Sequence, residues 1–237
     1  FVQNEESIRL LAGIGVQGNV SLSGDTRFDR VLGIASNPEE IPHIKAFCGA
    51  APVLVAGSTW YEDEVELLHY VKVHPEIQFI IAPHEISAER LGKIQKEFSN
   101  TVLYSSLVSG GSPEGHVLVI DNIGMLSRLY RYATVTYVGG GFGADGIHNV
   151  LEAAVYGKPV VFGPVYEKYD EAVGLVACGG GLVANGPLKL EAVLQGLFGD
   201  SGALHKAGEA SRVFVQQGAG ASAAIIAFIQ AKRLLTS

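Results

Sequence analysis

Short apolar runs alternate with helical patterns along most of this chain, and this alternation limits the possible fold more than any other feature. The strand-like runs are rich in Val, Ile and Leu and lie at residues 53–56, 77–82, 101–104, 116–120, 134–138, 159–162 and 181–184. Helical patterns separate most of them, at residues 63–73, 88–98, 125–132, 150–156 and 167–176. Such alternation predicts right-handed β-α-β units, and therefore an α/β fold with a doubly wound, Rossmann-like, mostly parallel sheet. Ligands of such sheets bind at the carboxyl ends of the strands.

The segments on either side of this alternation have a different character. Residues 5–11 fit a short amphipathic helix, residues 19–22 fit a strand, and a further helix is expected to begin near Arg27. Prolines and acidic residues break the apolar pattern over residues 23–52, so we expect a helical connector outside the core, where a lobe boundary could fall. The pattern of residues 188–235 predicts a helical tail that ends in an Ala-rich apolar segment.

The composition excludes several classes of protein. Hydrophobic residues make up 48% of the 237 residues, charged residues 17%, and glycine occurs 30 times, which suits a buried parallel sheet with tight loops. A net charge of -7 argues against nucleic-acid binding, because neutralising phosphates requires clustered Lys and Arg. Cys48 and Cys178 are the only cysteines, so we expect them to pack in apolar settings rather than form a disulfide or a zinc site.

Two further features concern targeting and completeness. No apolar run reaches the ~18 residues of a membrane-spanning helix, and the first residues lack the pattern of a signal peptide. The sequence begins with Phe1 rather than Met, so we expect a fragment or a processed chain.

A glycine-rich loop is the strongest candidate for a binding site. Residues 138–154 read V-G-G-G-F-G-A-D-G-I-H-N-V-L-E-A-A and lie between a predicted strand and a predicted helix. Such a junction gathers free backbone N–H groups and the positive end of a helix dipole, while glycines let an anion approach the backbone closely. The loop therefore predicts a phosphate site, although a loop that only turns tightly is the alternative.

The same loop also matches a dinucleotide-binding motif. Gly141, Gly143 and Gly146 fit G-x-G-x-x-G, and Glu167 follows Gly146 by 21 residues, near the position of a ribose-binding acid. An enzyme that uses a nicotinamide cofactor and a protein that binds another nucleotide are both consistent with this string.

Loops after the first two predicted strands of the regular region offer further candidates. Gly57, Ser58, Thr59 and Trp60 would lie at the same edge as the glycine loop and contribute hydroxyl and N–H groups. The spacing of Thr59 and Glu62 also fits a capping box, so this loop could be a helix cap instead. His84 could donate to a phosphate or a carboxylate, or lie in a solvated loop.

Two later segments allow both a binding role and a structural one. Residues 121–125 offer backbone groups beside apolar side chains, which would suit a nucleobase, but they also fit an ordinary helix start. Glu152 could accept hydrogen bonds from ribose hydroxyls. Asn149 and Glu152 also have capping-box spacing, and His148 precedes them.

Several motifs, taken in order, resemble those of the 3-deoxy-D-manno-octulosonic acid (Kdo) transferases of lipopolysaccharide assembly. They are F-V-Q-N-E-E-S at the start, S-G-D-T-R-F-D-R-V at residues 23–31, G-S-T-W at Gly57, A-P-H-E at Ala82, I-D-N-I-G-M-L at Ile120, and G-G-G-F followed by G-I-H-N-V-L-E-A-A and G-K-P-V-V-F-G-P. The similarity is collinear and spans essentially all of the chain, so it is more specific than a single glycine motif.

The resemblance implies the C-terminal, donor-binding lobe of a glycosyltransferase-B fold. Residues 1–30 would be the end of the N-terminal lobe and a linker, and residues 31–237 the domain that binds the nucleotide sugar. The implied enzyme is an inverting transferase that moves Kdo from CMP-Kdo to the lipid A precursor, with no cofactor and no bound metal. It would act in the cytoplasm at the inner face of the inner membrane, and contact the acceptor and the membrane only through the N-terminal lobe.

The resemblance also implies roles for individual residues. The phosphate and the sugar acid would be bound by Gly140, Gly141, Phe142, Gly146, His148 and Asn149. Glu152 would hold the ribose, and the cytosine would lie beside Ile123, Gly124 and Met125. Ser58, Thr59 and His84 would complete the donor site. The catalytic glutamate of the family lies in the N-terminal lobe, so no catalytic residue is expected in this chain.

The sequence departs from the family at two positions of the implied site. Pro83 precedes His84 where many members have a basic residue, and Ile147 stands where G-G-H-N is common. Two alternative functions also stay open: an NAD-dependent oxidoreductase domain that uses the G-x-G-x-x-G string, and a non-catalytic module that binds nucleotide sugars. Several predicted strands precede the string, whereas a dinucleotide fingerprint usually opens the first β-α-β unit.

Overall fold

The computed structural model describes residues 1–37 and 39–234, and the sheet within them has seven strands, all parallel. The strands are β1 (Val53–Thr59), β2 (Gln78–Pro83), β3 (Thr101–Leu103), β4 (Val117–Val119), β5 (Val135–Val138), β6 (Val160–Phe162) and β7 (Gly181–Val183). Their order in the sheet is β3-β4-β2-β1-β5-β6-β7. Strands β2, β4 and β3 thus lie to one side of β1, with β3 at the edge, and β5, β6 and β7 follow in order on the other side, which confirms the predicted doubly wound α/β fold.

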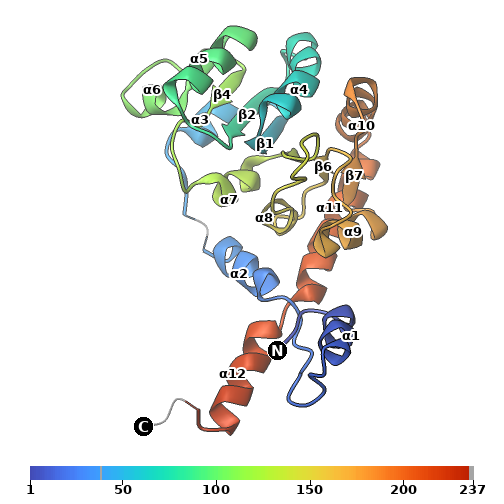
Figure 1. Cartoon of the computed structure of the whole chain (residues 1–237). Coiled ribbons are helices and arrows are strands. Elements are labelled where there is room, and N and C mark those ends of the chain that lie inside the picture. The colour runs from blue at the N-terminus through green and yellow to red at the C-terminus, as the bar shows by residue number, and fades with distance from the viewer. Residues whose placement is uncertain (38, 235–237) are drawn as a thin grey trace.

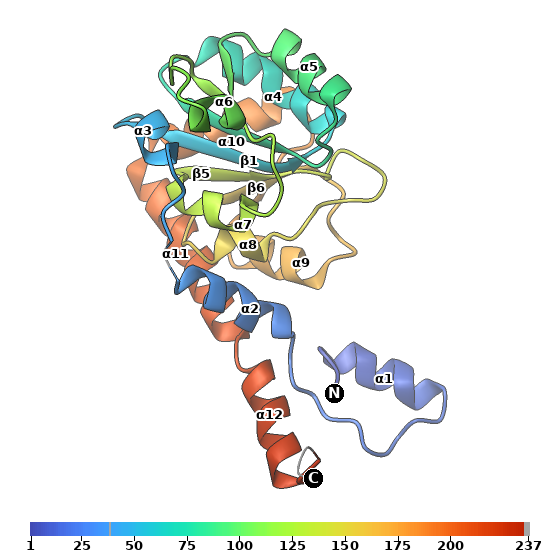
Figure 2. The same cartoon turned by 90° about the vertical axis from the view of Figure 1, so that its left-hand side faces the viewer.

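Helices cover both faces of the sheet (Figures 1 and 2). Alternate residues of β1 point to opposite faces, so that Leu54 joins one buried cluster and Val55 the other. The Leu54 face is covered by α4 (Tyr61–Val73), α5 (Ala88–Glu97) and α10 (Pro187–Gly199). The Val55 face is covered by α2 (Thr26–Ala35), α3 (Ile44–Cys48), α6 (Tyr104–Val108), α7 (Leu126–Leu129) with the 3-10 turn Tyr130–Tyr132, α8 (Leu151–Ala154) and α9 (Asp170–Ala177).

Two expectations for the first 52 residues are wrong. Residues 19–22 form no strand but one parallel bridge between Val2 and Leu22, because Asn19 takes a left-handed φ of 59° that interrupts the extended chain. The segment 23–52 is part of the core, since the buried side chains of Phe28 and Ile44 pack on the sheet. Pro38, one of the prolines in that segment, lies outside the described residues.

The C-terminal tail is helical, as predicted, and its described part forms three helices. After α10 come α11 (Ser201–Gly218) and α12 (Ala221–Ala231), while the predicted helical position Leu235 lies outside the described residues. Asp29 fixes the break between α11 and α12, because its carboxylate accepts 2.7 Å hydrogen bonds from the N–H groups of Gly220 and Ser222. Both α12 and α1 (Glu5–Gly13) project from the body of the lobe (Figures 1 and 2).

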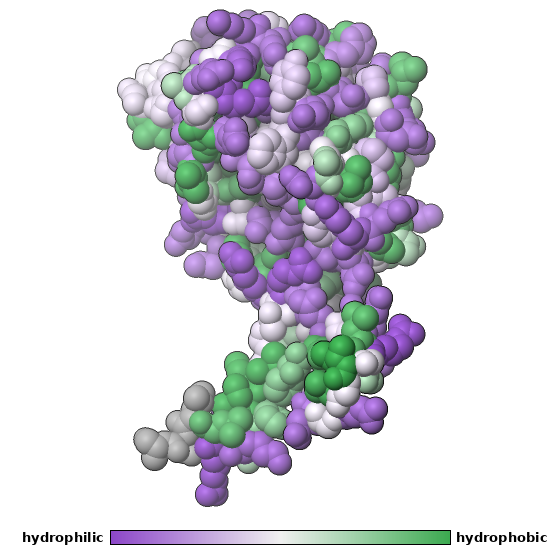
Figure 3. Space-filling model, in the orientation of Figure 1, coloured by the Kyte–Doolittle hydropathy of each residue, from purple (hydrophilic) through white to green (hydrophobic). Residues whose placement is uncertain are grey.

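The projecting part exposes apolar side chains (Figure 3). Ile226 of α12 is 53% exposed, and Phe228 makes an edge-on contact with Phe1 at 5.1 Å between ring centroids. By length and composition alone, the helical stretch Ser201–Ala231 would be apolar enough to cross a membrane. It is, however, two helices, and α11 packs against α2, α8, α9 and α10, so we assign α11 to the lobe.

Candidate functional site

A cavity of about 390 Å³ lies where the winding of the sheet reverses, at the carboxyl ends of β1, β2 and β5. This is the crevice in which open α/β sheets bind their ligands. Its lining residues come from the loops after these strands, from the first turn of α4 and from the segment before α9: Trp60, Glu62, His84, Gly140, Gly143, Ala144, Asp145, Gly146, Ile147, His148 and Tyr169. Predicted site residues from three separate loops therefore meet at one place.

Two other backbone segments pass so close to the loop after β5 that side chains would not fit at some of its positions. A Cβ on Gly141 would lie 2.6 Å from the backbone nitrogen of Gly163, and one on Gly139 would lie 2.3 Å from the carbonyl oxygen of Ser58. Gly140 adopts a φ of 93°, which favours glycine. By contrast, a Cβ on Gly143 would meet nothing closer than the Gly140 oxygen at 3.4 Å. The structure thus requires the triple glycine, and not the middle glycine of the G-x-G-x-x-G string.

The backbone N–H groups of the loop divide into those that hold it and those that stay free. Gly140 N donates to Asp63 Oδ2 at 2.8 Å, and His148 N donates to the Gly139 carbonyl at 3.0 Å. Within the described parts of the chain, several N–H groups of this segment donate to no protein acceptor: those of Gly141, Phe142, Ala144, Asp145 and Asn149. Of these residues Ala144 and Asp145 line the cavity, whereas the predicted residues Gly141, Phe142 and Asn149 do not.

The helix that follows is shorter than the predicted range 150–156. Helix α8 is a single turn, because Gly157 leaves the helical region with a φ of 65° and Pro159 cannot continue it. A dipole of one turn adds little to anion binding, so the helix contributes less to the predicted phosphate site than expected. The side-chain oxygen of Asn149 accepts a hydrogen bond from Leu151 N, in the first turn of α8, at 3.0 Å. The side-chain nitrogen of Asn149 lies 3.5 Å from the Glu152 carboxylate.

Three aromatic side chains form a group beside the loop, and the hydrogen bond that joins two of them was not predicted. Trp60 Nε1 donates to His148 Nε2 at 3.0 Å, with the two rings within 16° of coplanar. His84 stacks across both, at 4.4 Å from the Trp60 ring centroid and 4.5 Å from that of His148. Burial and the nearby His84 lower the pKa of His148. Both predicted histidines therefore lie at the cavity, joined by Trp60.

Buried acids behind the site hold the loop after β1. Asp63 accepts three hydrogen bonds, from Trp60 N at 2.9 Å, Gly140 N at 2.8 Å and the Tyr137 hydroxyl at 2.7 Å. The predicted capping box of Thr59 and Glu62 is wrong, because α4 begins at Tyr61 and Asp63 caps it.

The two hydroxyl residues of that loop do not line the cavity. Thr59 is 1% exposed and donates to the buried carboxylate of Glu64 at 2.8 Å. Ser58 lies at the irregular register of β1 with a left-handed φ of 53°.

The residues implied for the nucleoside lie outside this cavity. Ile123 is 91% exposed, Gly124 has a φ of 95°, and Met125 is buried in the core. Gly124 borders a neighbouring hollow of about 460 Å³ together with Arg30. Burial raises the pKa of Glu152, although the charge of Arg30 and the hydrogen bond from Asn149 oppose this. Arg30 is thus a charged neighbour that sequence reasoning missed.

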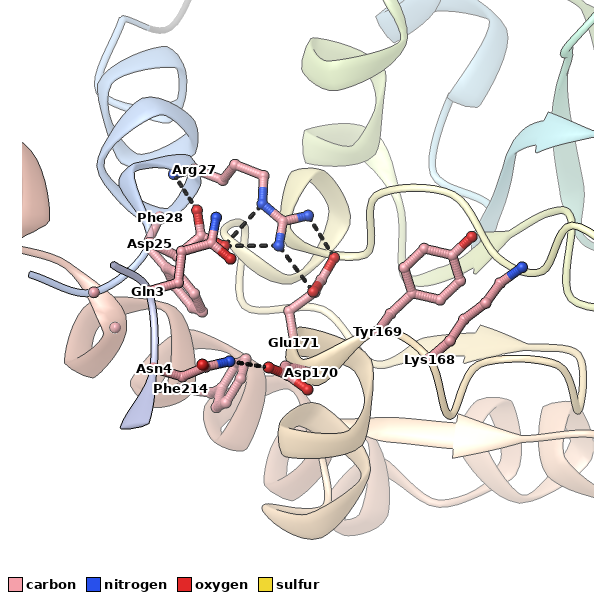
Figure 4. A pocket seen from close by; sticks show the side chains of 12 residues that line it. Gln3, Asn4, Asp25, Arg27, Phe28, Lys168, Tyr169, Asp170, Glu171 and Phe214 are labelled. Carbon is pink, nitrogen blue, oxygen red and sulfur yellow. Dashed lines mark hydrogen bonds and ion pairs between the residues drawn. The ribbon is translucent and has the colours of Figure 1, made fainter. Parts of the chain in front are cut away.

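A second cavity, of about 400 Å³, adjoins the first at Tyr169 (Figure 4). Tyr169 donates its hydroxyl proton to the Asp145 carbonyl at 2.8 Å. On the far side, Arg27 of α2 binds both carboxylate oxygens of Glu171, at 2.6 and 2.9 Å. Asn4 Nδ2 donates to Asp170 at 2.6 Å. These contacts tie the N-terminal segment to α9.

The two departures from the family fall at buried positions. Pro83 ends β2, opposite Thr59, and His84 N donates to the Thr59 carbonyl at 2.9 Å. Ile147 is 3% exposed and packs in the core, while its N–H donates to the Val165 carbonyl at 3.1 Å. Among residues 1–37 and 39–234, no group of three or more His, Cys, Asp or Glu side chains is placed to hold a metal ion.

The position of Trp60 at the crevice was predicted from the G-S-T-W motif directly after a predicted strand, but its hydrogen bond to His148 was not. The role of Asp63 depends on Tyr137 and Gly140, which follow it by more than 70 residues, and no local pattern announces it. The same holds for Gly163, whose place against Gly141 follows from the pairing of β5 and β6.

Sequence comparison finds relatives among glycosyltransferases. No family model matches the chain. A bifunctional glycosyltransferase/methyltransferase of Fusobacterium nucleatum is 31% identical over 180 residues, which are 73% of this chain and 27% of that protein. The 3-deoxy-D-manno-octulosonic acid transferase of Aquifex aeolicus is 31% identical over 125 residues, covering 50% of this chain and 33% of that protein. The chain therefore spans about a third of the length of these relatives.

Solved structures share the fold. The C-terminal CMP-Kdo binding domain of WaaA from Acinetobacter baumannii superposes with a TM-score of 0.63 at 20% identity, covering 79% of this chain and 99% of that domain. MnaA from S. aureus, solved with UDP, superposes with a TM-score of 0.65 at 14% identity over 100% of this chain and 61% of that protein. By sequence and fold together, the chain is a relative of the 3-deoxy-D-manno-octulosonic acid transferases and has the fold of a C-terminal glycosyltransferase-B lobe.

Proposed function

We propose that this chain is the donor-binding lobe of a glycosyltransferase that moves Kdo from CMP-Kdo to the lipid A precursor. One observation carries the proposal. Motifs that resemble those of Kdo transferases lie far apart in the sequence, yet Trp60, His84 and the loop Gly140–His148 border one crevice at the reversal point of the sheet. The curated transferases of Aquifex aeolicus and Rickettsia felis, and the solved CMP-Kdo binding domain, support this ligand.

The chemistry of the crevice suits an anionic nucleotide sugar. CMP-Kdo carries a phosphodiester and a carboxylate. The unpaired N–H groups of Ala144 and Asp145 lie in the crevice lining and would bind these oxygens, together with those of Gly141, Phe142 and Asn149 in the same segment of the chain. His148, which borders the same cavity, would add a side-chain donor. Glu152 would accept from the ribose hydroxyls, with the cytosine beside Ile123, Gly124 and Met125.

In the proposed reaction an acceptor hydroxyl attacks the anomeric carbon of Kdo, a new C–O bond forms with inversion, and CMP leaves. The glutamate that takes the proton lies in a lobe outside this chain, which spans 27–40% of the length of its first relatives. General-base help contributes roughly 10²–10⁴-fold, and positioning of the acceptor contributes more. The chain alone should therefore bind CMP and transfer no Kdo.

We further propose that the acceptor and the inner face of the inner membrane are reached through the lobe outside this chain, and that no metal or cofactor takes part.

The oxidoreductase alternative is weaker on structural grounds. The G-x-G-x-x-G string follows β5 rather than the first strand, and Gly143 has room for a side chain. Glu167 is exposed in a turn before α9 and not at the end of a strand. A dinucleotide site needs glycines where the backbone approaches the pyrophosphate and an acid placed to bind the ribose. A non-catalytic module that binds nucleotide sugars would have the same crevice, so transfer activity of the complete protein separates it from the proposal.

Titration calorimetry with CMP, UDP and NADH tests the proposed function. We expect the chain to bind CMP, to bind UDP more weakly and to show no binding of NADH. Glu152→Gln should weaken CMP binding by about 5- to 10-fold, since a charged acceptor becomes a neutral one, while the circular dichroism spectrum stays unchanged. Tighter binding of NADH than of CMP, or Kdo transfer by the chain alone, would refute the proposal.

A further inference from the structure

The hydrogen bond between Trp60 and His148 determines where the imidazole proton lies. An indole N–H is only a donor, so Nε2 of His148, 3.0 Å away, accepts with its lone pair. A histidine that accepts at Nε2 is neutral and carries its proton on Nδ1. Burial and the adjacent His84, which both lower the pKa of His148, favour this neutral form.

The remaining edges of the ring show which atom can face a ligand. Nε2 faces Trp60, and Cδ2 lies against the backbone, since a Cβ on Gly140 would be 3.1 Å from it. His84 covers one ring face at 4.5 Å between centroids. Within the described residues Nδ1 has no protein partner, and His148 lines the cavity. The Nδ1–H group is therefore the ring's free donor beside the glycine loop.

We propose that Trp60 is a positioning residue that holds His148 in the Nδ1–H tautomer, so that this N–H donates to a phosphate oxygen of the bound nucleotide. The inference rests on the proposed function for the identity of the ligand. Trp60 acts through His148 and touches no reacting atom. Without the indole N–H, the neutral imidazole exchanges between its two tautomers, and only one of them presents a donor at Nδ1.

The tautomer can be measured without any ligand. In ¹⁵N NMR spectra of the free chain, we expect His148 Nδ1 to have the shift of a protonated, pyrrole-type nitrogen and Nε2 that of an unprotonated one. Trp60→Phe keeps an aromatic ring against His84 and removes the N–H, so both shifts should move toward an average of the tautomers. An unprotonated Nδ1 in the wild-type chain would overturn the proposal, whatever the chain binds.

A double-mutant cycle tests whether Trp60 acts through His148. Trp60→Phe should weaken CMP binding by about 3- to 10-fold, the effect of one hydrogen bond. His148→Asn supplies an amide donor close to the position of Nδ1 that needs no tautomer, so Trp60→Phe should have little further effect in that background. Cytidine, which lacks the phosphate, should bind the wild type and Trp60→Phe equally well.

The outcomes separate the two proposals. Fully additive effects on CMP binding, or an equal loss for cytidine, mean that Trp60 contributes by packing alone, and the positioning role is then wrong. If the wild-type chain binds no CMP at all, the proposed function fails, while the NMR shifts still decide whether Trp60 sets the tautomer of His148.

Discussion

At the scale of single residues, the glycines of the loop after β5 differ sharply in what they can tolerate. We predict that Gly141→Ala destabilises the chain by about 1–3 kcal/mol, because its methyl group would meet the Gly163 backbone at 2.6 Å. The matched variant Gly143→Ala should change the free energy of unfolding by less than about 0.5 kcal/mol, since its nearest neighbour is 3.4 Å away.

Urea denaturation of the two glycine variants provides the measurement, with calorimetry for NADH. A dinucleotide fingerprint would need Gly143 for close approach of the pyrophosphate, so NADH binding by the wild type that Gly143→Ala abolishes would favour the oxidoreductase alternative. Wild-type stability of Gly141→Ala would show that the two loops are further apart than the structure has them.

At the scale of elements, helix α4 joins the crevice to the core through two buried acids in its first turn. Asp63 holds the glycine loop, and Glu64 binds Thr59 and forms an ion pair with Arg90. Burial raises the pKa of Glu64 from 4.5 to about 7, against the effects of Thr59 and Arg90. The folded chain thus holds this proton over a pH range in which the unfolded chain has released it.

This shift predicts the sign of a pH dependence. The contribution of Glu64 to stability is complete below the unfolded pKa of 4.5 and is lost as the pH rises through about 7. Relative to Glu64→Gln, which keeps an acceptor for Thr59, the wild type should lose about 1–3 kcal/mol of unfolding free energy between about pH 5 and about pH 8. Urea titrations of both proteins at these pH values measure the difference. A relative gain for the wild type would mean that Arg90 dominates and lowers the pKa of Glu64.

Most elements could be predicted from the sequence because buried parallel strands are continuous apolar runs with glycine or proline at their ends. All seven predicted strands between residues 53 and 184 are present, with shifted ends; β1, for example, continues through the irregular Ser58 to Thr59. The segment 23–52 was misjudged because prolines interrupt its pattern, whereas tertiary packing buries Phe28 and Ile44. Hydrophobic patterns in the sequence predict the strands, whose buried residues follow one another, but not a segment that contributes only isolated side chains to the core.

At the scale of the whole molecule, the topology accounts for the part of the site that could be predicted. Loops that follow parallel strands gather at one edge, which brings His84, Gly140 and His148 to the same cavity. Finer geometry depends on contacts between distant residues. The sequence does not show that Thr59 turns into the core, or that Trp60 binds a histidine 88 residues away.

The opposite edge of the sheet provides an internal control for the location of the site. A cavity of about 540 Å³ lies at the amino ends of β5 and β6, lined in part by Thr134, Lys158 and Arg212. Lys158 and Arg212 bring basic side chains to this cavity, and burial lowers the pKa of Lys158. If positive charge alone attracted the nucleotide, it would bind at this edge, far from the glycine loop.

Mapping CMP by NMR is the most direct test that the crevice between β1 and β5 is the nucleotide site. On titration with CMP, we predict changes in the amide resonances of Gly141, Phe142 and Asn149 and in the indole N–H of Trp60, with Lys158 and Arg212 unaffected. Changes that cluster around Lys158 and Arg212, or a spectrum that CMP leaves unchanged, would contradict the assignment of the glycine loop as the donor site.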